Sequence, residues 1–156
     1  MKITAQEEYG IRILLRIAQF PNVDGITINE ISKTEGLTVP NVAKLCRILR
    51  LEGFIKSSRG QFGGYSLAKA ADEIKLNDVI QALGGKLFES KFCESHTGVL
   101  DLCRHSVDCS IRSLWQIIQN TLDDVLGNLT LKDLMIENDF INVKTDGLSF
   151  TVDVEK

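Results

Sequence analysis

The sequence predicts a mainly α-helical fold with small β-hairpins. Three observations indicate this fold class. Apolar residues recur at spacings of three and four along most of the chain, as they do on one face of an α-helix. Breaks rich in glycine separate these periodic stretches. Two short regions, residues 54–67 and 138–156, instead combine strand-forming residues with turn residues, which is typical of hairpins.

Composition and charge restrict the class of protein. No apolar run approaches the ~20 residues that cross a bilayer, and the N-terminus lacks the apolar stretch of a signal peptide. We therefore expect a cytoplasmic protein with no membrane partner. The net charge of −3 is unevenly spread: residues 1–86 carry 12 Lys and Arg against 9 Asp and Glu, whereas residues 87–156 carry 6 against 12. The first part suits nucleic acid and the second does not.

Residues 3–20 predict the first helix, because Ile3, Tyr9, Ile13 and Ile17 recur at helical spacing. A break rich in turn residues follows it, from residue 21 to residue 25.

The next stretch predicts a helix-turn-helix. Thr27 and Glu30 form a capping-box pair that opens a short helix, and Gly36 can end that helix in a left-handed conformation. Thr38 is expected to cap the second helix, which ends at Gly53. The second helix has a basic outer face and one apolar stripe, made of Val42, Leu45, Cys46 and Leu49. Cys46 is therefore interpreted as a core residue.

A hairpin follows the second helix directly. Phe54–Lys56 and Tyr65–Leu67 can pair as strands, and the glycines between them permit a tight turn and a close approach to another molecule. A hairpin in this place is a wing, so the sequence predicts binding to double-stranded DNA. Asn and Arg can read base edges, whereas Lys and an Arg at the wing tip suit phosphate. The expected contacts are Thr38, Asn41, Lys44, Arg47, Arg59, Gly60 and Gly63.

Two further helices are predicted after the wing. The first covers residues 77–83, with Asn77 as its cap and Gly84 and Gly85 at its end. The second begins near residue 111 and has about four turns. Its apolar stripe consists of Ile111, Leu114, Trp115, Ile118, Leu122 and Val125. Such a stripe is more typical of a core or a dimer interface than of a cofactor site, and a two-fold dimer would match a pseudo-palindromic operator.

The last part of the chain predicts a short helical turn and a hairpin. Thr130 and Asp133 open the helical turn. In the tail, Asp146 and Gly147 form a favourable type I′ turn between two alternating strands.

One polar loop gathers three of the four cysteines, Cys93, Cys103 and Cys109, and both histidines, His96 and His105. No Cys-x-x-Cys pair is present, so a zinc ribbon and a thioredoxin-type redox pair are poorly matched. Three thiolates on an accessible loop suit an iron–sulfur cluster, but zinc and unliganded thiols that switch by forming a disulfide stay open on spacing alone. A cluster usually needs a fourth ligand, and each histidine is a weak candidate for it.

The sequence does not favour an enzyme. The glycines of RGQFGGY lie in a hairpin and do not precede a helix, so they form no phosphate-binding loop. Neither a pair of catalytic carboxylates nor a nucleophile with an orienting base is apparent.

Five stretches resemble, in the same order, the bacterial winged-helix iron–sulfur regulators that include IscR and NsrR. They are MKIT with its following Tyr, RGQFGGYSL, LNDVIQAL, the cysteine loop ending in CSIRSLW, and LTLKDLM. The resemblance implies a homodimeric transcription factor. It divides the chain into a winged helix-turn-helix domain (1–86), a cluster loop (87–110), a dimerisation helix region (111–137) and an added C-terminal hairpin (138–156).

The resemblance also implies a ligand set. Cys93, Cys103 and Cys109 match the three cluster cysteines of this group. Arg112 stands where the IscR branch has a histidine ligand, whereas Glu8 matches the carboxylate that the NsrR branch takes from the first helix of the partner subunit. This implies a 4Fe–4S cluster, or alternatively a 2Fe–2S cluster, with a weakly held carboxylate ligand that nitric oxide or an oxidant can displace.

The resulting expectation is a repressor whose affinity for its operator depends on a cluster that senses nitric oxide, redox state or cluster supply. The alternative is a regulator of the same fold that contains zinc or uses metal-free thiols.

Overall fold

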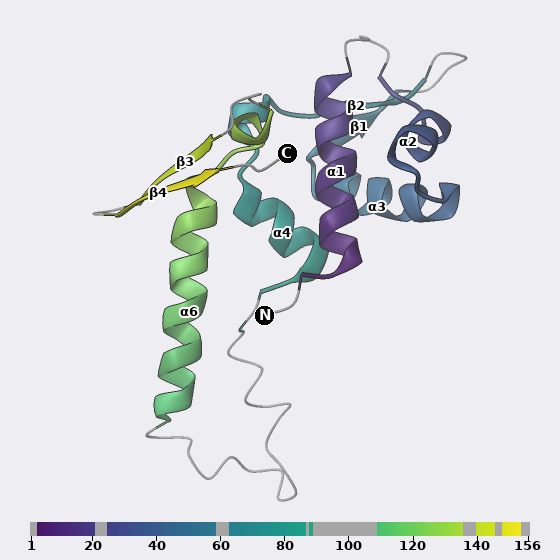
Figure 1. Cartoon of the computed structure of the whole chain (residues 1–156). Helices are drawn as coiled ribbons and strands as arrows, with labels where there is room; N and C mark the ends of the chain where they lie inside the picture. The colour runs from purple at the N-terminus through teal and green to yellow at the C-terminus, as the bar shows by residue number, and fades with distance from the viewer. Residues whose placement is uncertain are drawn as a thin grey trace, which may run out of the picture.

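The computed structural model describes residues 3–20, 25–58, 63–86, 88, 109–135, 140–145 and 148–153. Figure 1 shows a helical body with a small hairpin, beside which a long helix extends away. The elements are α1 (Ala5–Gln19), α2 (Ile28–Glu35), α3 (Val39–Leu51), β1 (Ile55–Ser57), β2 (Tyr65–Leu67), the 3-10 turn η1 (Ala71–Glu73), α4 (Leu76–Gly84), α6 (Ser110–Gly127), the 3-10 turn η2 (Lys132–Leu134), β3 (Phe140–Thr145) and β4 (Leu148–Asp153). The expected mainly helical fold with small hairpins is confirmed.

Helices α1, α2, α3 and α4 and the wing strands share one large apolar core. Its side chains exposed by less than 2% are Ile13, Leu14, Ile26, Ile31, Val42, Leu45, Cys46, Leu49, Ile55, Ile74, Val79 and Leu131. The apolar stripe predicted for α3, with Cys46, is therefore confirmed as core. Leu131 lies beyond α6 in the sequence, so the chain returns to this core after the long helix.

Local capping starts and ends α2, the first helix of the helix-turn-helix, as predicted. The Thr27 N–H donates to Glu30 Oε2 at 2.8 Å, and the Glu30 N–H donates to Thr27 Oγ1 at 3.2 Å. Gly36 ends α2 with a φ of +66°, and Gly53 follows α3 with a φ of +75°. Thr38 occupies the N-cap position of α3, but its side chain makes no capping hydrogen bond.

The wing strands pair antiparallel, with Ile55 opposite Leu67. Tyr65 also exchanges two backbone hydrogen bonds with Ile26, at 2.8 and 3.0 Å, so the base of the wing is joined to the segment before α2. A Cβ at Gly64 would lie 2.9 Å from both the N and the O of Ile26. This close approach requires glycine at position 64.

Two expected helix boundaries are wrong. Helix α4 begins at Leu76 after Lys75, so Asn77 lies inside the first turn and is not the cap. Tertiary contacts set this start: the N–H of Leu76, a buried residue, donates to Leu129 O at 2.9 Å. Ile3 precedes α1 and is 68% exposed, so it does not belong to the first helix.

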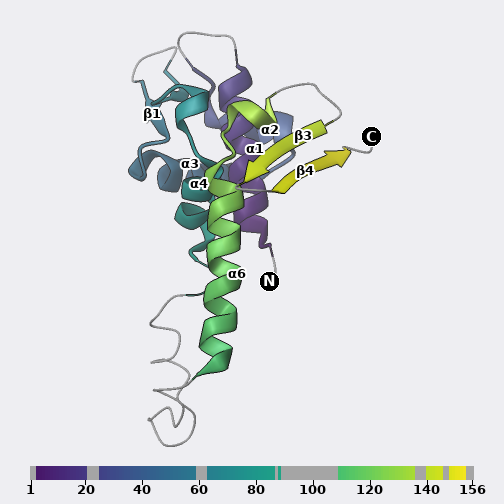
Figure 2. The same ribbon diagram turned by 90° about the vertical axis from the view of Figure 1, so that its left-hand side faces the viewer.

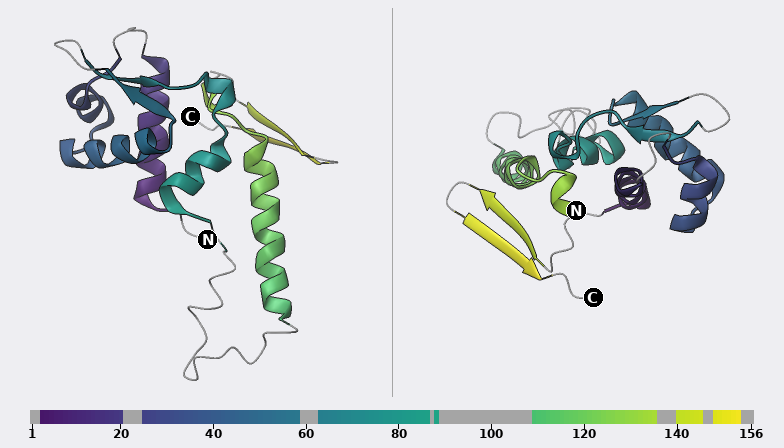
Figure 3. Two further views of the ribbon diagram at one scale, coloured as in Figure 1. Left: turned by 180° about the vertical axis from the view of Figure 1, so that it is seen from behind. Right: turned by 90° about the horizontal axis from the view of Figure 1, so that it is seen from above.

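Helix α6 is 18 residues long, about five turns, and its two halves differ. The C-terminal half lies against α4, and the N-terminal half extends away from the body (Figures 2 and 3). The exposed apolar side chains of that half are Ile111, Leu114, Trp115 and Ile117. The apolar stripe predicted for this helix is therefore buried against the body only in part.

The C-terminal hairpin is present as predicted. Strands β3 and β4 pair antiparallel from Phe140 opposite Asp153 to Thr145 opposite Leu148, beside the C-terminal end of α6. Among the described residues, no helix is both long enough and apolar enough to cross a membrane.

Candidate DNA-binding face and cluster ligands

The outer face of α3 carries no carboxylate. Lys44, Arg47 and Arg50 are exposed along it, opposite the buried stripe. Its first turn is apolar, with Val39 44% exposed and Pro40 also exposed. A helix of this kind, preceded by a capped helix and a tight turn, can enter a DNA major groove and hold phosphates at its edges.

The expected DNA contacts fall into three groups. Those on or next to α3 are Thr38, Lys44 and Arg47, which are exposed, and Asn41, which is half-buried. Gly63 lies at the base of the wing. Arg59 and Gly60, at the wing tip, lie outside the described residues.

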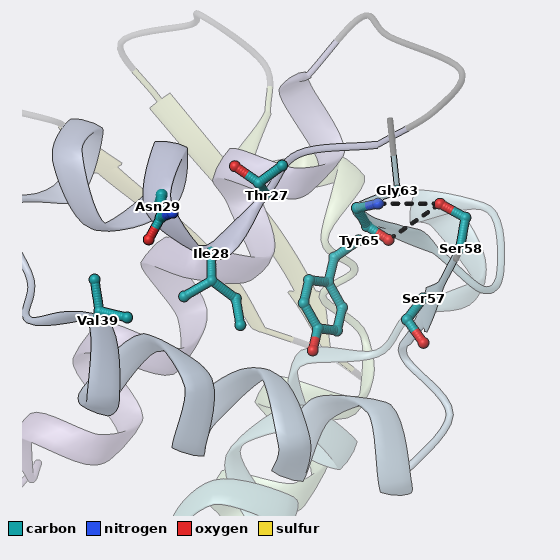
Figure 4. A pocket seen from close by; sticks show the side chains of 9 residues that line it. Thr27, Ile28, Asn29, Val39, Ser57, Ser58, Gly63 and Tyr65 are labelled. Atoms are coloured by element: carbon teal, nitrogen blue, oxygen red, sulfur yellow. Dashed lines mark hydrogen bonds between the residues drawn. The ribbon is translucent and has the colours of Figure 1, made fainter. Parts of the chain in front are cut away.

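A hollow of about 580 Å³ lies between α2, α3 and the base of the wing. Figure 4 shows Ile28, Val39 and Tyr65 facing it from three different elements. The Ser58 hydroxyl oxygen accepts the Gly64 N–H at 3.1 Å and fixes the wing base beside it. The complete lining is Thr27, Ile28, Asn29, Val39, Ser57, Ser58, Gly63, Gly64 and Tyr65.

Gln6 joins the first turns of α1 to two other helices. Lys44 Nζ, on α3, donates to Gln6 Oε1 at 2.9 Å. Gln6 Nε2 donates to the carbonyl oxygen of Leu83 near the end of α4. Lys44 was predicted to contact DNA alone, and this second contact is not evident from the sequence because its partner lies 38 positions away.

A second polar link ties α1 to the end of α2. Glu35 Oε1 lies 2.6 Å from Arg16 Nε, and Glu35 Oε2 lies 3.1 Å from the guanidinium of Arg12. The Glu35 side chain is only 8% exposed, whereas each arginine keeps about 40% exposure. Helix α1 is thus joined to both helices of the helix-turn-helix.

Glu8 is exposed and lines a groove between α1, α4 and α6. The groove measures about 430 Å³ and also holds Glu7. Its apolar lining consists of Ile3, Ile11, Ile80, Leu122 and Leu126.

Cys109 caps the N-terminus of α6. Its Sγ accepts the backbone N–H of Arg112 at 3.3 Å, and its side chain is half-buried. The positive end of the helix therefore faces the sulfur, which suits a thiolate ligand. Cys93, Cys103 and the two histidines, His96 and His105, lie outside the described residues.

The described residues of one protomer do not gather a metal site by themselves. No group of three or more His, Cys, Asp and Glu side chains among them could hold a metal ion. Cys109 lies at the end of α6 that extends from the body, and Glu8 lies on α1 within the body (Figure 2). Three thiolates and one carboxylate are nevertheless a donor set that suits an iron–sulfur cluster, provided that two chains share it.

Cys46 is not a candidate ligand. It is fully buried, and desolvation raises the pKa of its thiol to about 12. It therefore stays a protonated core residue, as predicted.

Gln119, which was not predicted from the sequence, holds the chain at Phe88, just before the cysteines. It is the buried polar residue of α6, 5% exposed. Its Oε1 accepts the Phe88 N–H at 3.0 Å, and its Nε2 donates to Asp123 at 2.8 Å, so it fixes the chain where the loop begins. Its spacing, four after Trp115 and three before Leu122, places it on the apolar stripe and could have revealed it.

Comparisons with known proteins give a consistent result. The model of the Rrf2 family, described as an iron-dependent transcriptional regulator, matches residues 3–137. Protein rrf2 of Nitratidesulfovibrio vulgaris is 33% identical over 135 residues, which are 86% of this chain and 87% of that protein.

Two solved structures extend the comparison. IscR of T. potens has a TM-score of 0.66 and 28% identity, with 86% of each chain covered. CymR, described as the global cysteine regulator of B. subtilis, has a TM-score of 0.68 and 29% identity, with 89% of this chain and 99% of that chain covered. The winged-helix fold expected from the sequence agrees with these regulators.

Proposed function

Because the chain belongs to the Rrf2 family of DNA-binding transcriptional regulators, and is therefore a regulator and not an enzyme, we propose that it represses transcription and that an iron–sulfur cluster switches its affinity for its operator. One observation carries the proposal: α1, which bears Glu8, is also the helix whose side chains hold the helix-turn-helix through Lys44 and Glu35. A ligand bound at Glu8 is thus mechanically connected to the DNA-binding face.

We further propose a two-fold homodimer, which binds a double-stranded operator with two half-sites in the cytoplasm. The exposed apolar side chains on the N-terminal half of α6 need a partner, since apolar patches of this kind mark interaction sites. The groove beside Glu8 has a complementary apolar lining. A second copy that places its α6 there would bury both surfaces and bring its cysteine loop to Glu8.

In this dimer Cys93, Cys103 and Cys109 of one protomer and Glu8 of the partner subunit would hold the cluster. The cluster would supply a group that reacts with nitric oxide or oxidants and that is lost when its supply fails. A 4Fe–4S cluster is favoured, and a 2Fe–2S cluster is the alternative. The carboxylate of Glu8 is a hard ligand and the thiolates are soft, so the carboxylate is the one most easily displaced.

The chain's own residues would transmit the change. When Glu8 is held, the N-terminal end of α1 is fixed against the partner, and Gln6 keeps its hydrogen bond to Lys44. When Glu8 is released, this end can shift and the two recognition helices can change their spacing. Cluster-loaded and cluster-free protein must then differ in operator affinity, because a ligand shifts an equilibrium only through its differential affinity.

Anaerobic purification, followed by a visible spectrum and by iron and sulfide assays, tests the ligand set. We expect a coloured protein, with loss of the cluster or a changed spectrum in Glu8→Ala. Glu52→Ala, which removes another exposed carboxylate outside the groove, is the matched control and should keep the spectrum. An unchanged spectrum in Glu8→Ala would assign the fourth ligand to His96, His105 or an external thiol.

Operator affinity tests the switch separately. Protein with and without cluster is titrated against the same duplex under anaerobic conditions. Equal affinities would refute the switch even if a cluster were present.

The likeness to CymR, described as a global cysteine regulator, leaves a second candidate open, a regulator that uses thiols without metal. Such a protein would be colourless, and cysteine substitution would abolish its regulation. A zinc-containing regulator would also be colourless but insensitive to oxidant. The visible spectrum therefore separates the cluster-containing protein from both alternatives, and operator affinity measured before and after treatment with an oxidant separates these two.

A further inference from the structure

The first turn of α3 is apolar on the side that is free of the core. Val39 is 44% exposed, Pro40 is exposed and Ala43 is half-buried. The first charged residue of the helix is Lys44, which already donates a hydrogen bond to Gln6. The end of the helix that approaches bases in a helix-turn-helix therefore presents methyl groups.

Val39 does not belong to the side of α3 that packs in the core. The buried side of α3 consists of Val42, Leu45, Cys46 and Leu49, and Val39 lies apart from it. Val39 instead faces the hollow described above, together with Ile28 of α2 and Tyr65 of β2 (Figure 4). Three largely apolar side chains from three elements thus line one hollow on the DNA-binding face.

A phosphate is a poor occupant of this hollow. The N-terminus of α2, which could otherwise attract an anion, already holds the carboxylate of Glu30. Glu30 Oε2 accepts both the N–H and the hydroxyl of Thr27, at 2.8 and 2.7 Å, and Thr27 lines the hollow. A second negative group would be repelled, whereas an uncharged base edge would not.

We propose that Val39 contacts the C5-methyl of a thymine in each operator half-site and so determines base specificity at that position. In the major groove thymine is distinguished by this methyl group, which apolar side chains recognise. The proposal rests on DNA binding by the family fold but does not depend on a cluster.

The experiment begins with a duplex selected in vitro from a randomised library by the full-length protein. Each conserved thymine is then replaced singly by deoxyuridine, which keeps the base pair and removes only the methyl group. We expect one position per half-site where wild-type affinity falls roughly fourfold, the amount expected for one buried methyl group. Val39→Ala should bind the thymine duplex more weakly and lose nothing further with deoxyuridine.

Leu51→Ala is the matched control. Leu51 is 65% exposed at the other end of α3, so this variant should keep the full deoxyuridine penalty. Circular dichroism and thermal melting verify that both variants fold.

Three results would overturn the proposal: a selected consensus without a conserved thymine in each half-site, wild-type affinity insensitive to every deoxyuridine, or an undiminished penalty in Val39→Ala. In each case, binding to the selected duplex would still support the proposal that the protein is a DNA-binding regulator. Failure of the Val39 contact is therefore distinguishable from failure of the proposed function.

Discussion

Helices α1 and α4 approach each other at Gly10, which is buried. A Cβ at this position would lie 2.5 and 2.6 Å from the two Cδ atoms of Leu83 and 3.1 Å from its Cγ. Leu83 is 3% exposed, so its side chain cannot turn into solvent. We therefore expect Gly10→Ala to destabilise the protein, although alanine is the better helix former.

Two opposing terms set the magnitude. Replacing glycine by alanine inside a helix raises the free energy of unfolding by roughly 1 kcal/mol. Overpacking a core costs about 1–3 kcal/mol, and the upper part of that range applies because three atoms of Leu83 obstruct the new methyl group. The free energy of unfolding should fall by about 1–2 kcal/mol.

Gly127→Ala is the matched control at the end of α6. No atom lies within 4 Å of a Cβ there, and its φ is outside the left-handed region, so this variant should gain up to about 1 kcal/mol. Urea unfolding followed by circular dichroism measures both variants. If Gly10→Ala were stabilised as much as Gly127→Ala, the close contact between α1 and α4 would be refuted.

Three other predictions follow from single side chains. Burial raises the pKa of the Cys46 thiol to about 12, so iodoacetamide at pH 8 should alkylate Cys109 in the folded, cluster-free protein but reach Cys46 only in urea, as mass spectrometry would show. Hydrogen bonds from the hydroxyl and the backbone N–H of Thr27 lower the pKa of Glu30 below 4.5, so their stabilisation is present above pH 4.5 and is lost as pH falls through the lower folded value. Thr27→Ala keeps the backbone N–H, so it should reduce this pH dependence of the urea midpoint by the share of the hydroxyl, which is the larger one. Gln6→Leu removes the hydrogen bond to α3 and should reduce the difference between the operator affinities of the cluster-loaded and cluster-free forms by about fivefold, whichever form binds more tightly, in fluorescence anisotropy titrations; an unchanged difference would exclude this link.

Local chemistry explains why the helix-turn-helix could be predicted. The capping box of α2 needs only Thr27 and Glu30 at a spacing of three, and Gly36 ends the helix through its own backbone freedom. The start of α4 could not be predicted in this way, because a hydrogen bond between Leu76 and Leu129 decides it. That bond joins residues separated by the whole cysteine loop and all of α6.

In the candidate site, too, local sequence predicted some features and tertiary contacts decided the others. The spacing in α6 predicted an apolar stripe but not that Trp115 would be exposed while Gln119 is buried, since the surrounding elements decide which part of a stripe is covered. The basic face of α3 followed from composition and spacing. The hydrogen bond between Lys44 and Gln6 is a tertiary contact, which neither composition nor spacing can indicate.

The packing of α1 explains why a change at Glu8 cannot remain local. Two positions after Glu8, Gly10 lies directly against Leu83, and close-packed side chains transmit a displacement better than they absorb it. Two positions before Glu8, Gln6 is bonded to α4 and to Lys44. A movement of this end of α1 must therefore shift α4, shift the recognition helix or break the hydrogen bond to Lys44, and each outcome alters the face that meets DNA.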